Sequence, residues 1–244
     1  MKAERIFVPE CSNTMEAMEQ VLAKRPLPEG SFLLTEFQQG GEGQEGAVWE
    51  SEPGRNLLVT FVYYPSFLEA AAQFMFSKAV SLAVYDTLRA VLPEASIRIK
   101  WPNDLFLGEH KVAGILMRNQ VSGERMGRTL IGLGLNVNQE AFPDHLPGAI
   151  SLKGYDGRER STHTLLDHLR EMLDRYYDLL QVGEWDYLDE LYLQRLYRIG
   201  VRGGYVVRGE LVEARITGVD AFGRLLLEDG ERHWVCAMKE VVYL

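Results

Sequence analysis

Residues 100–104 read Lys-Trp-Pro-Asn-Asp, and residues 111–116 read Lys-Val-Ala-Gly-Ile-Leu. This stretch predicts a polar turn that begins at Pro102 and an apolar strand that follows Lys111 directly. Because a strand fixes the direction of its side chains, we expect Lys111 to aim its amine at one point in a pocket. A lysine on its own is usually a solvated surface residue, so this expectation depends on the surrounding motif.

The composition excludes several classes of protein. The chain has 244 residues and a formal net charge of −9, which disfavours a general nucleic-acid binder because such proteins present basic surfaces. No apolar run reaches the roughly 18 residues of a membrane span, and the first residues lack the apolar region of a signal peptide. With only two distant cysteines, Cys11 and Cys236, and no zinc-site histidine spacing, we expect a cytoplasmic protein without a membrane or DNA partner.

The order of the expected elements predicts an α+β fold, with a mixed β-sheet backed by helices and then a small β-barrel. A helix is expected to begin at residues 12–14, a second to run from a Ser66/Glu69 capping box to about Val91, and two more to lie within 162–196. The segment 40–46 is expected to be loop, because four of its seven residues are glycine. Short apolar runs between glycine turns after Gly200 predict the barrel, so we divide the chain into domains 1–198 and 199–244.

These features resemble the biotin protein ligases, enzymes that adenylate biotin and attach it to a carrier lysine. The resemblance includes the motif at 100–116, the Gly-Leu-Gly-Leu-Asn run at 132–136 and the C-terminal segment 218–241. It implies a class II synthetase-like catalytic domain, an SH3-like C-terminal barrel and no DNA-binding domain. It also implies biotin and ATP as substrates, Mg²⁺ with the ATP, a biotin carboxyl carrier protein as partner and, in some members, a homodimer.

The resemblance implies roles for individual residues. Lys111 matches the lysine that bridges the biotin carboxylate and the α-phosphate, and is the expected catalytic residue. The expected biotin contacts are Lys111 with Ser12, Asn13, Thr14, Gln38, Gly41, Glu42, Gly43, Gln44, Gly114 and Gly132. The expected nucleotide contacts are Trp49, Lys100, Asn103, Asn136 and Lys239. Residues 12–14 also fit a second interpretation, in which they only cap a helix.

The glycine segment departs from the family pattern. The family usually carries arginines there, whereas this chain has Glu42, Gln44 and Glu45 and no Lys or Arg between Thr35 and Glu52. A carboxylate in place of a cation near phosphate would lose an attraction and add a repulsion, each of order a few kcal/mol. Three hypotheses follow: a working ligase in which Glu42 or Glu45 binds Mg²⁺, an enzyme that makes the adenylate slowly and releases it, or a biotin-binding module without chemistry. A lipoate or octanoate ligase of the same superfold is a further alternative.

Overall fold

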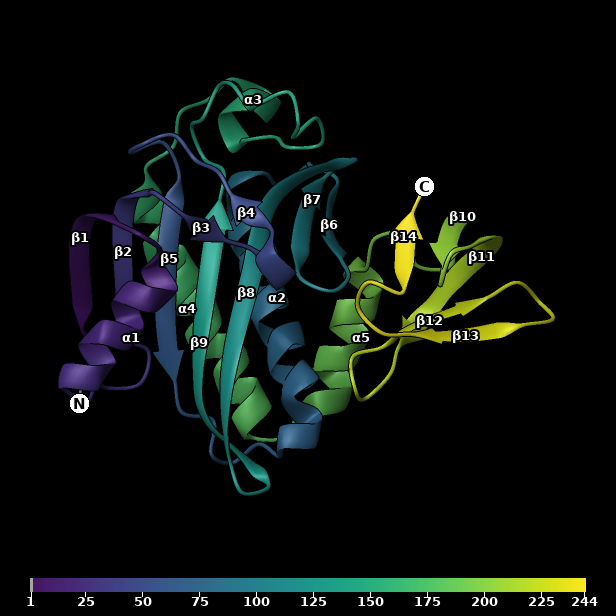
Figure 1. Cartoon of the computed structure of the whole chain (residues 1–244), viewed down its shortest axis with the longest axis horizontal. Helices are drawn as coiled ribbons and strands as arrows, with labels where there is room; N and C mark the ends of the chain where they lie inside the picture. The colour runs from purple at the N-terminus through teal and green to yellow at the C-terminus, as the bar shows by residue number, and fades with distance from the viewer. Residues whose placement is uncertain (1) are drawn as a thin grey trace.

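The computed structural model of the protein describes residues 2–244, except for the side chain of Glu45. Its main element is a seven-stranded sheet in which the first pair of strands is parallel and the other pairs are antiparallel (Figure 1). In sheet order the strands are β1 (Arg5–Cys11), β2 (Phe32–Gln38), β5 (Leu57–Tyr63), β9 (Arg125–Leu135), β8 (His110–Ser122), β7 (Asp104–Leu107) and β6 (Ile97–Lys100). The predicted mixed sheet is confirmed.

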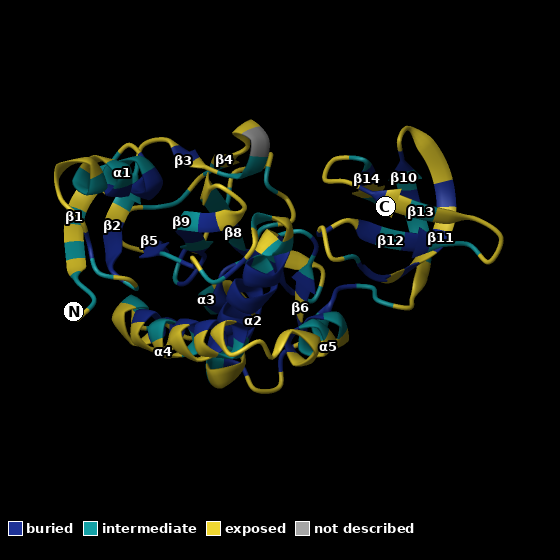
Figure 2. Cartoon of the chain, turned by 90° about the horizontal axis from the view of Figure 1, so that it is seen from below, coloured by how far each residue is buried: buried dark blue, intermediate teal, exposed yellow. Residues whose placement is uncertain are grey.

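Helices cover both faces of this sheet (Figures 1 and 2). One face carries α1 (Thr14–Lys24), whose Met15 and Met18 pack with Leu33, Val62 and Leu130 of the sheet. The other face carries the larger core, covered by α2 (Gln73–Val91), α4 (Thr162–Gln181) and α5 (Trp185–Arg195), while a short helix, α3 (Leu152–Asp156), follows β9. The fully buried strand β5 contributes to both cores because alternate side chains of a strand point to opposite faces.

The two helices expected within 162–196 are present as α4 and α5. Asn13 caps α1, since its side chain accepts a hydrogen bond from the N–H of Glu16 at 2.8 Å. The long helix, however, begins at Gln73 rather than at Ser66, so the predicted capping box was wrong. The backbone at 68–70 is instead bonded to the start of β9, where the N–H of Ala70 donates to Glu124 and that of Met126 to Leu68, and a short 3-10 helix (Ala70–Ala72) follows.

The prediction that residues 40–46 form a loop was also wrong. Strand β3 (Gly41–Glu42) pairs with β4 (Val48–Trp49), and a 3-10 helix, η1 (Gln44–Gly46), connects them. We call residues 40–49 the glycine hairpin. A β-carbon on Gly41 would lie 2.4 Å from the Trp49 carbonyl oxygen, so glycine permits this close pairing instead of preventing it.

The C-terminal region forms a second, five-stranded antiparallel sheet. Its strands, in sheet order, are β13 (His233–Cys236), β12 (Leu225–Glu228), β11 (Glu210–Val219), β10 (Arg202–Val207) and β14 (Val241–Tyr243). The indole N–H of Trp101 donates to the Gly223 carbonyl at 2.8 Å, and so ties the 100–104 motif to this sheet. Within residues 2–244, no helix has the length and apolar character needed to span a membrane.

Candidate active site

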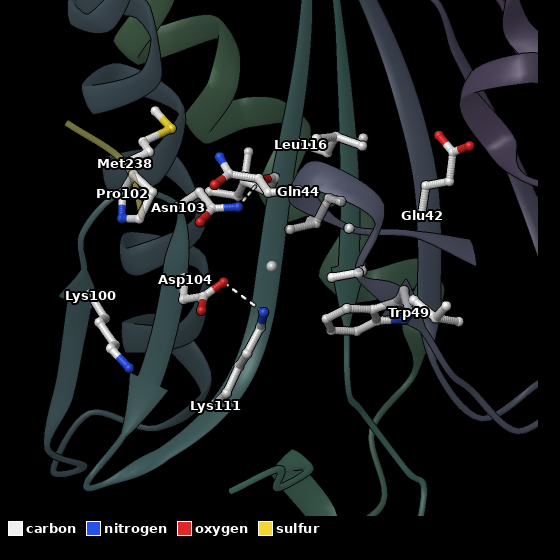
Figure 3. A pocket seen from close by; sticks show the side chains of 18 of the residues that line it. Glu42, Gln44, Trp49, Lys100, Pro102, Asn103, Asp104, Lys111, Leu116 and Met238 are labelled. Carbon is white, nitrogen blue, oxygen red and sulfur yellow. Dashed lines mark hydrogen bonds and ion pairs between the residues drawn. The ribbon is translucent and has the colours of Figure 1, made fainter. Parts of the chain in front are cut away.

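A cavity of about 390 Å³ lies beside α1 on its face of the large sheet, over β8 and β9 (Figure 3). The glycine hairpin and the C-terminal sheet contribute the other walls. The residues expected from sequence that line it are Asn13, Thr14, Gln38, Glu42, Gly43, Gln44, Trp49, Lys100, Asn103, Lys111, Gly114, Gly132 and Lys239. Segments far apart in the chain therefore meet at one site.

Lys111 stands near the start of β8 with its side chain 37% exposed, at the edge of the cavity. Its Nζ lies 2.7 Å from Oδ1 of Asp104 and 5.7 Å from the centre of the Trp49 ring (Figure 3). Its backbone is held on a third side, since its N–H donates to Gly148 at 2.7 Å and its carbonyl accepts from Ile150 at 3.0 Å. The amine is therefore directed into the cavity by a fixed strand, as the sequence predicts.

A second cation, Lys100, lies at the end of β6 between two aromatic rings. Its Nζ is 4.8 Å from the centre of Phe106 and 4.9 Å from the centre of Tyr243, which belongs to the C-terminal sheet. Burial lowers the pKa of Lys100; Asp104 opposes this shift, and the positive charge of Lys111 adds to it. The rings thus hold a partly desolvated positive charge against the same cavity.

The polar end of the cavity is a chain of hydrogen bonds. The hydroxyl of Thr60 donates to that of Thr14 at 2.9 Å, and both the N–H and the hydroxyl of Thr14 donate to Oε1 of Gln38, at 2.8 and 3.0 Å. Because its acceptor oxygen is already used, Gln38 can offer a ligand only the N–H groups of its amide. This end is therefore suited to a carbonyl-like acceptor.

Three glycines make the floor of the cavity flat. Gly114 and Gly134 are directly paired across β8 and β9, and β-carbons there would lie 3.1 and 2.3 Å from the indole of Trp49. A β-carbon on Gly132 would lie 3.1 Å from the sulfur of Met15 on α1. The absence of side chains at these positions lets the indole lie close to the strands. Its buried Nε1 has no hydrogen-bond partner among the described residues.

Three of the expected residues do not line the cavity. Ser12 is exposed and its hydroxyl donates to Glu16 at 2.7 Å, while Gly41 is buried under Trp49. Asn136 is 3% exposed, and its amide donates to the Ile150 carbonyl, the same residue that bonds the backbone of Lys111. Among the described residues its Oδ1 has no partner. Asn136 and the backbone of Lys111 are therefore both hydrogen-bonded to Ile150.

The comparisons with known proteins agree on one family. The model of the biotin/lipoate A/B protein ligase family matches residues 8–136. The biotin–[acetyl-CoA-carboxylase] ligase of Paracoccus denitrificans is 32% identical over 223 residues, which cover 87% of this chain and 90% of that protein. The chain belongs to the biotin/lipoate A/B protein ligase family.

Other relatives in this family are similar over most of the chain. The bifunctional ligase/repressor BirA of Bacillus spizizenii is 28% identical over 93% of this chain and 70% of its own length. A biotin protein ligase from Aquifex aeolicus, solved in complex with biotin and ATP, superimposes with a TM-score of 0.82 at 20% identity and 99% coverage of both chains. A biotin protein ligase from Leishmania major, in complex with biotinyl-5-AMP, superimposes with a TM-score of 0.67 at 17% identity, covering 97% of this chain and all of that one. At these identities the two structures establish the shared fold.

The structure also shows what the acidic residue of the glycine hairpin contacts. Glu42 points away from Lys111 and Asp104 (Figure 3) and forms an ion pair with Arg118 of β8 at 2.5 Å. Residues 40–49 contain no Lys or Arg, but a cation from β8 contacts the hairpin. The other acidic candidate, the Glu45 side chain, lies outside the described residues.

About half of the residues that line the cavity were not predicted from the sequence. The additional lining residues are Met15, Ala47, Val48, Trp101, Pro102, Asp104, Ile115, Leu116, Leu133, Gly134, Met238, Val241, Val242 and Tyr243. Asp104 had a usable signal, because it lies within the quoted motif, and a β7–β8 hairpin would pair it with Gly114 on the lysine strand. The C-terminal residues had no local signal, since only the docking of the second sheet brings them to the site.

Proposed function

We propose that this chain is a biotin–protein ligase that uses ATP to convert biotin to biotinyl-5′-AMP and transfers the biotinyl group to a lysine of a carrier protein. The observation that carries the proposal is Lys111, whose Nζ lies in a cavity with a flat glycine floor, a polar donor end and a covering indole. The glycine floor and the donor end would hold biotin, the indole would lie beside the nucleotide, and Lys111 would contact the phosphate between them. The named relatives, which are biotin ligases, support the same assignment.

The first step brings two anions into contact. A biotin carboxylate oxygen forms a bond to the α-phosphorus of ATP, and the bond to the pyrophosphate leaving group breaks. Lys111 and Lys100 would offset the mutual repulsion and the charge that develops on the phosphate. Asp104 holds the Lys111 amine in place at 2.7 Å before the substrates arrive.

In the second step, the neutral amine of the carrier lysine attacks the acyl carbon of the mixed anhydride. The acyl–oxygen bond breaks, AMP departs, and the amine loses its proton as the amide forms. The same cations stabilise the departing phosphate. The chemistry therefore needs no covalent intermediate on the protein.

The remaining residues receive roles from their places in the cavity. The amide of Gln38, held by Thr14, would donate to the urea oxygen of biotin, with Asn13 beside it at the start of α1. Gly114 and Gly132 would form the floor of the biotin slot, and Gly43 and Gln44 its roof. Trp49, Lys100, Asn103 and Lys239 would surround the nucleotide.

Mg²⁺ enters this proposal as part of the MgATP substrate. Within the described residues, no cluster of three or more His, Cys, Asp or Glu could hold a metal ion. The two carboxylates at the cavity, Asp104 and Glu42, are each paired with a cation. The earlier hypothesis of a magnesium site on Glu42 therefore lacks a free carboxylate, and the phosphates would be the main ligands.

Several broader features belong to the same proposal. The five-stranded sheet would be an SH3-like barrel, and residues 1–198 and 199–244 would be the two domains. The acceptor would be a biotin carboxyl carrier protein, the enzyme would be cytoplasmic, and the molecule would form a homodimer as some members of the family do.

The decisive experiment is mass spectrometry of a biotin-accepting domain incubated with this chain, biotin and MgATP. The proposal expects an increase by one biotinyl group on one lysine, and none when ATP is left out. An unmodified acceptor, together with no pyrophosphate release, would leave a non-catalytic biotin-binding module. Modification with lipoate but not with biotin would assign the lipoate branch of the family; the donor end formed by Gln38 argues against it, because a lipoyl chain has no urea to accept from that amide.

A further inference from the structure

The glycine hairpin is held to the protein mainly at its base and by one ring. At its base, the N–H of Gln39 donates to Cys11 at 3.0 Å and that of Gly40 to Ser12 at 2.9 Å. Beyond the base, its two strands pair over only two residues each, and Trp49 rests on Gly114 and Gly134. So short a hairpin is marginal alone, and a further contact on one of its strands therefore helps to decide whether it stays closed.

Arg118 supplies that contact. It projects from β8 and lies 2.5 Å from Glu42 of the hairpin and 3.4 Å from Glu19 of α1. Arg118 also lines a second cavity of about 420 Å³, together with Gly41, Glu42 and Gly46 of the hairpin. A single guanidinium thus joins the hairpin, the sheet and the helix that together enclose the substrate cavity.

We propose that Glu42 and Arg118 form a latch that keeps the glycine hairpin closed over the acyl-adenylate, and that Glu42 is a positioning residue. This inference rests on the proposed function for the identity of the enclosed molecule. The latch explains how an acidic residue can occupy a segment beside phosphate. The Glu42 carboxylate forms an ion pair with Arg118 and points away from Lys111.

The expected effect of the latch on hairpin opening depends on how far its two side chains are exposed to solvent. Glu42 is 43% exposed and Arg118 37%, so water and salt weaken their attraction. Exposed pairs of this kind change an equilibrium by about two- to fivefold. The latch would therefore shift the opening equilibrium by a few-fold and leave global stability nearly unchanged.

Hydrogen–deuterium exchange of the free protein measures this opening directly. The reporters are the amides of Gly43 and Ala47, which donate within the hairpin to Ala47 and Gln44. Glu42→Gln and Arg118→Gln should each speed exchange of residues 40–49 by about two- to fivefold. The double variant should exchange no faster than either single variant, because each substitution alone already removes the pair.

Glu19→Gln is the matched control. Glu19 contacts the same guanidinium from α1 but lies outside the hairpin, so its removal should leave exchange of residues 40–49 unchanged. Arg118→Lys should restore part of the protection, because it keeps the charge. Raising the salt concentration should speed exchange in the wild type and have little effect on the double variant.

The release of biotinyl-5′-AMP gives the functional readout. If the hairpin retains the adenylate, Glu42→Gln should speed its dissociation by the same factor as the exchange, while the rate of pyrophosphate formation changes less. Unchanged exchange in both single variants, or effects that add in the double variant, would overturn the latch. If exchange behaves as expected but no variant makes the adenylate, the latch stands and the proposed function fails.

Discussion

Two hairpins border the same cavity and are built differently. The hairpin of β7 and β8 carries Asp104 and Lys111 within a seven-stranded sheet, with buried neighbours such as Leu105 and Val112. The glycine hairpin pairs over two residues on each strand and is largely exposed. The comparison indicates that the proposed catalytic charge sits on an extensively paired element, whereas the proposed cover of the cavity is held by few backbone pairs.

The largest effect should come from the rigid hairpin. Lys111→Ala should lower the rate of adenylate formation on the order of 10³-fold, because the variant loses a charge directed at the reacting phosphate. The melting temperature should barely change, since the side chain is 37% exposed. Pyrophosphate release measures the rate of adenylate formation, and calorimetry measures the melting temperature.

Lys24→Ala is the control for this variant, because Lys24 is an exposed lysine at the end of α1. Lys24→Ala should leave the rate of adenylate formation and the melting temperature unaltered. If Lys111→Ala kept wild-type activity, the assignment of the catalytic lysine would be wrong, and so would the proposed role of the rigid hairpin.

The next effect should come from the contact between the two hairpins. Gly134→Ala would place a β-carbon 2.3 Å from the Trp49 indole and must displace the ring. Displacement of this kind costs about 1–3 kcal/mol, so we expect the KM for ATP to rise about tenfold or more. Initial-rate kinetics provide the measurement.

Gly204→Ala is the matched strand glycine, since its β-carbon would lie at an ordinary 3.5 Å from Leu244. Its KM should equal that of the wild type. Equal KM values for the two variants would show that the glycine hairpin does not depend on its contact with the floor.

A smaller effect should appear in the pH profile. Burial lowers the pKa of Lys100, so this lysine loses its charge at a lower pH than an ordinary lysine, and activity that needs the charge falls earlier on the alkaline side. Tyr243→Leu removes one covering ring and lets water reach the amine. The pKa of Lys100 should then rise, and the alkaline limb of kcat/KM should move to higher pH.

At neutral pH this variant should lose only a few-fold in kcat/KM, because one cation–π contact is worth about 0.5–1 kcal/mol. Tyr187→Leu, at an exposed tyrosine on α5, is the control. An alkaline limb that stays in place with Tyr243→Leu would mean that Lys100 does not set it.

The smallest effect concerns the edge of the cavity. Ser12→Ala should change the Kd for biotin by less than about twofold, because its hydroxyl is exposed and bonded to Glu16. Thr14→Val removes one of the two hydrogen bonds that hold Gln38 and should weaken binding by about tenfold. Calorimetric titration with biotin measures the Kd of both variants. An equal loss of affinity in Ser12→Ala and Thr14→Val would show that Ser12 contacts biotin.

Much of the fold follows from local patterns. The strand that follows Lys111 and the two helices α4 and α5 were predictable because each pattern reflects how the side chains of one element are buried. The start of α2 was missed because long-range backbone bonds to β9 override a local capping signal at Ser66. The pairing of β3 with β4 was missed because glycine can permit a close approach as well as break a strand.

The sequence by itself singled out Lys111 as the proposed central charge, since Lys111 lies in a contiguous motif whose turn and strand set its direction. Only the tertiary structure decided what surrounds that charge. Arg118 meets Glu42 across 76 positions, and Trp101 meets Gly223 across 122. Contacts at such separations leave no periodicity in the chain, because they depend on how finished sheets pack against each other and not on neighbours in sequence.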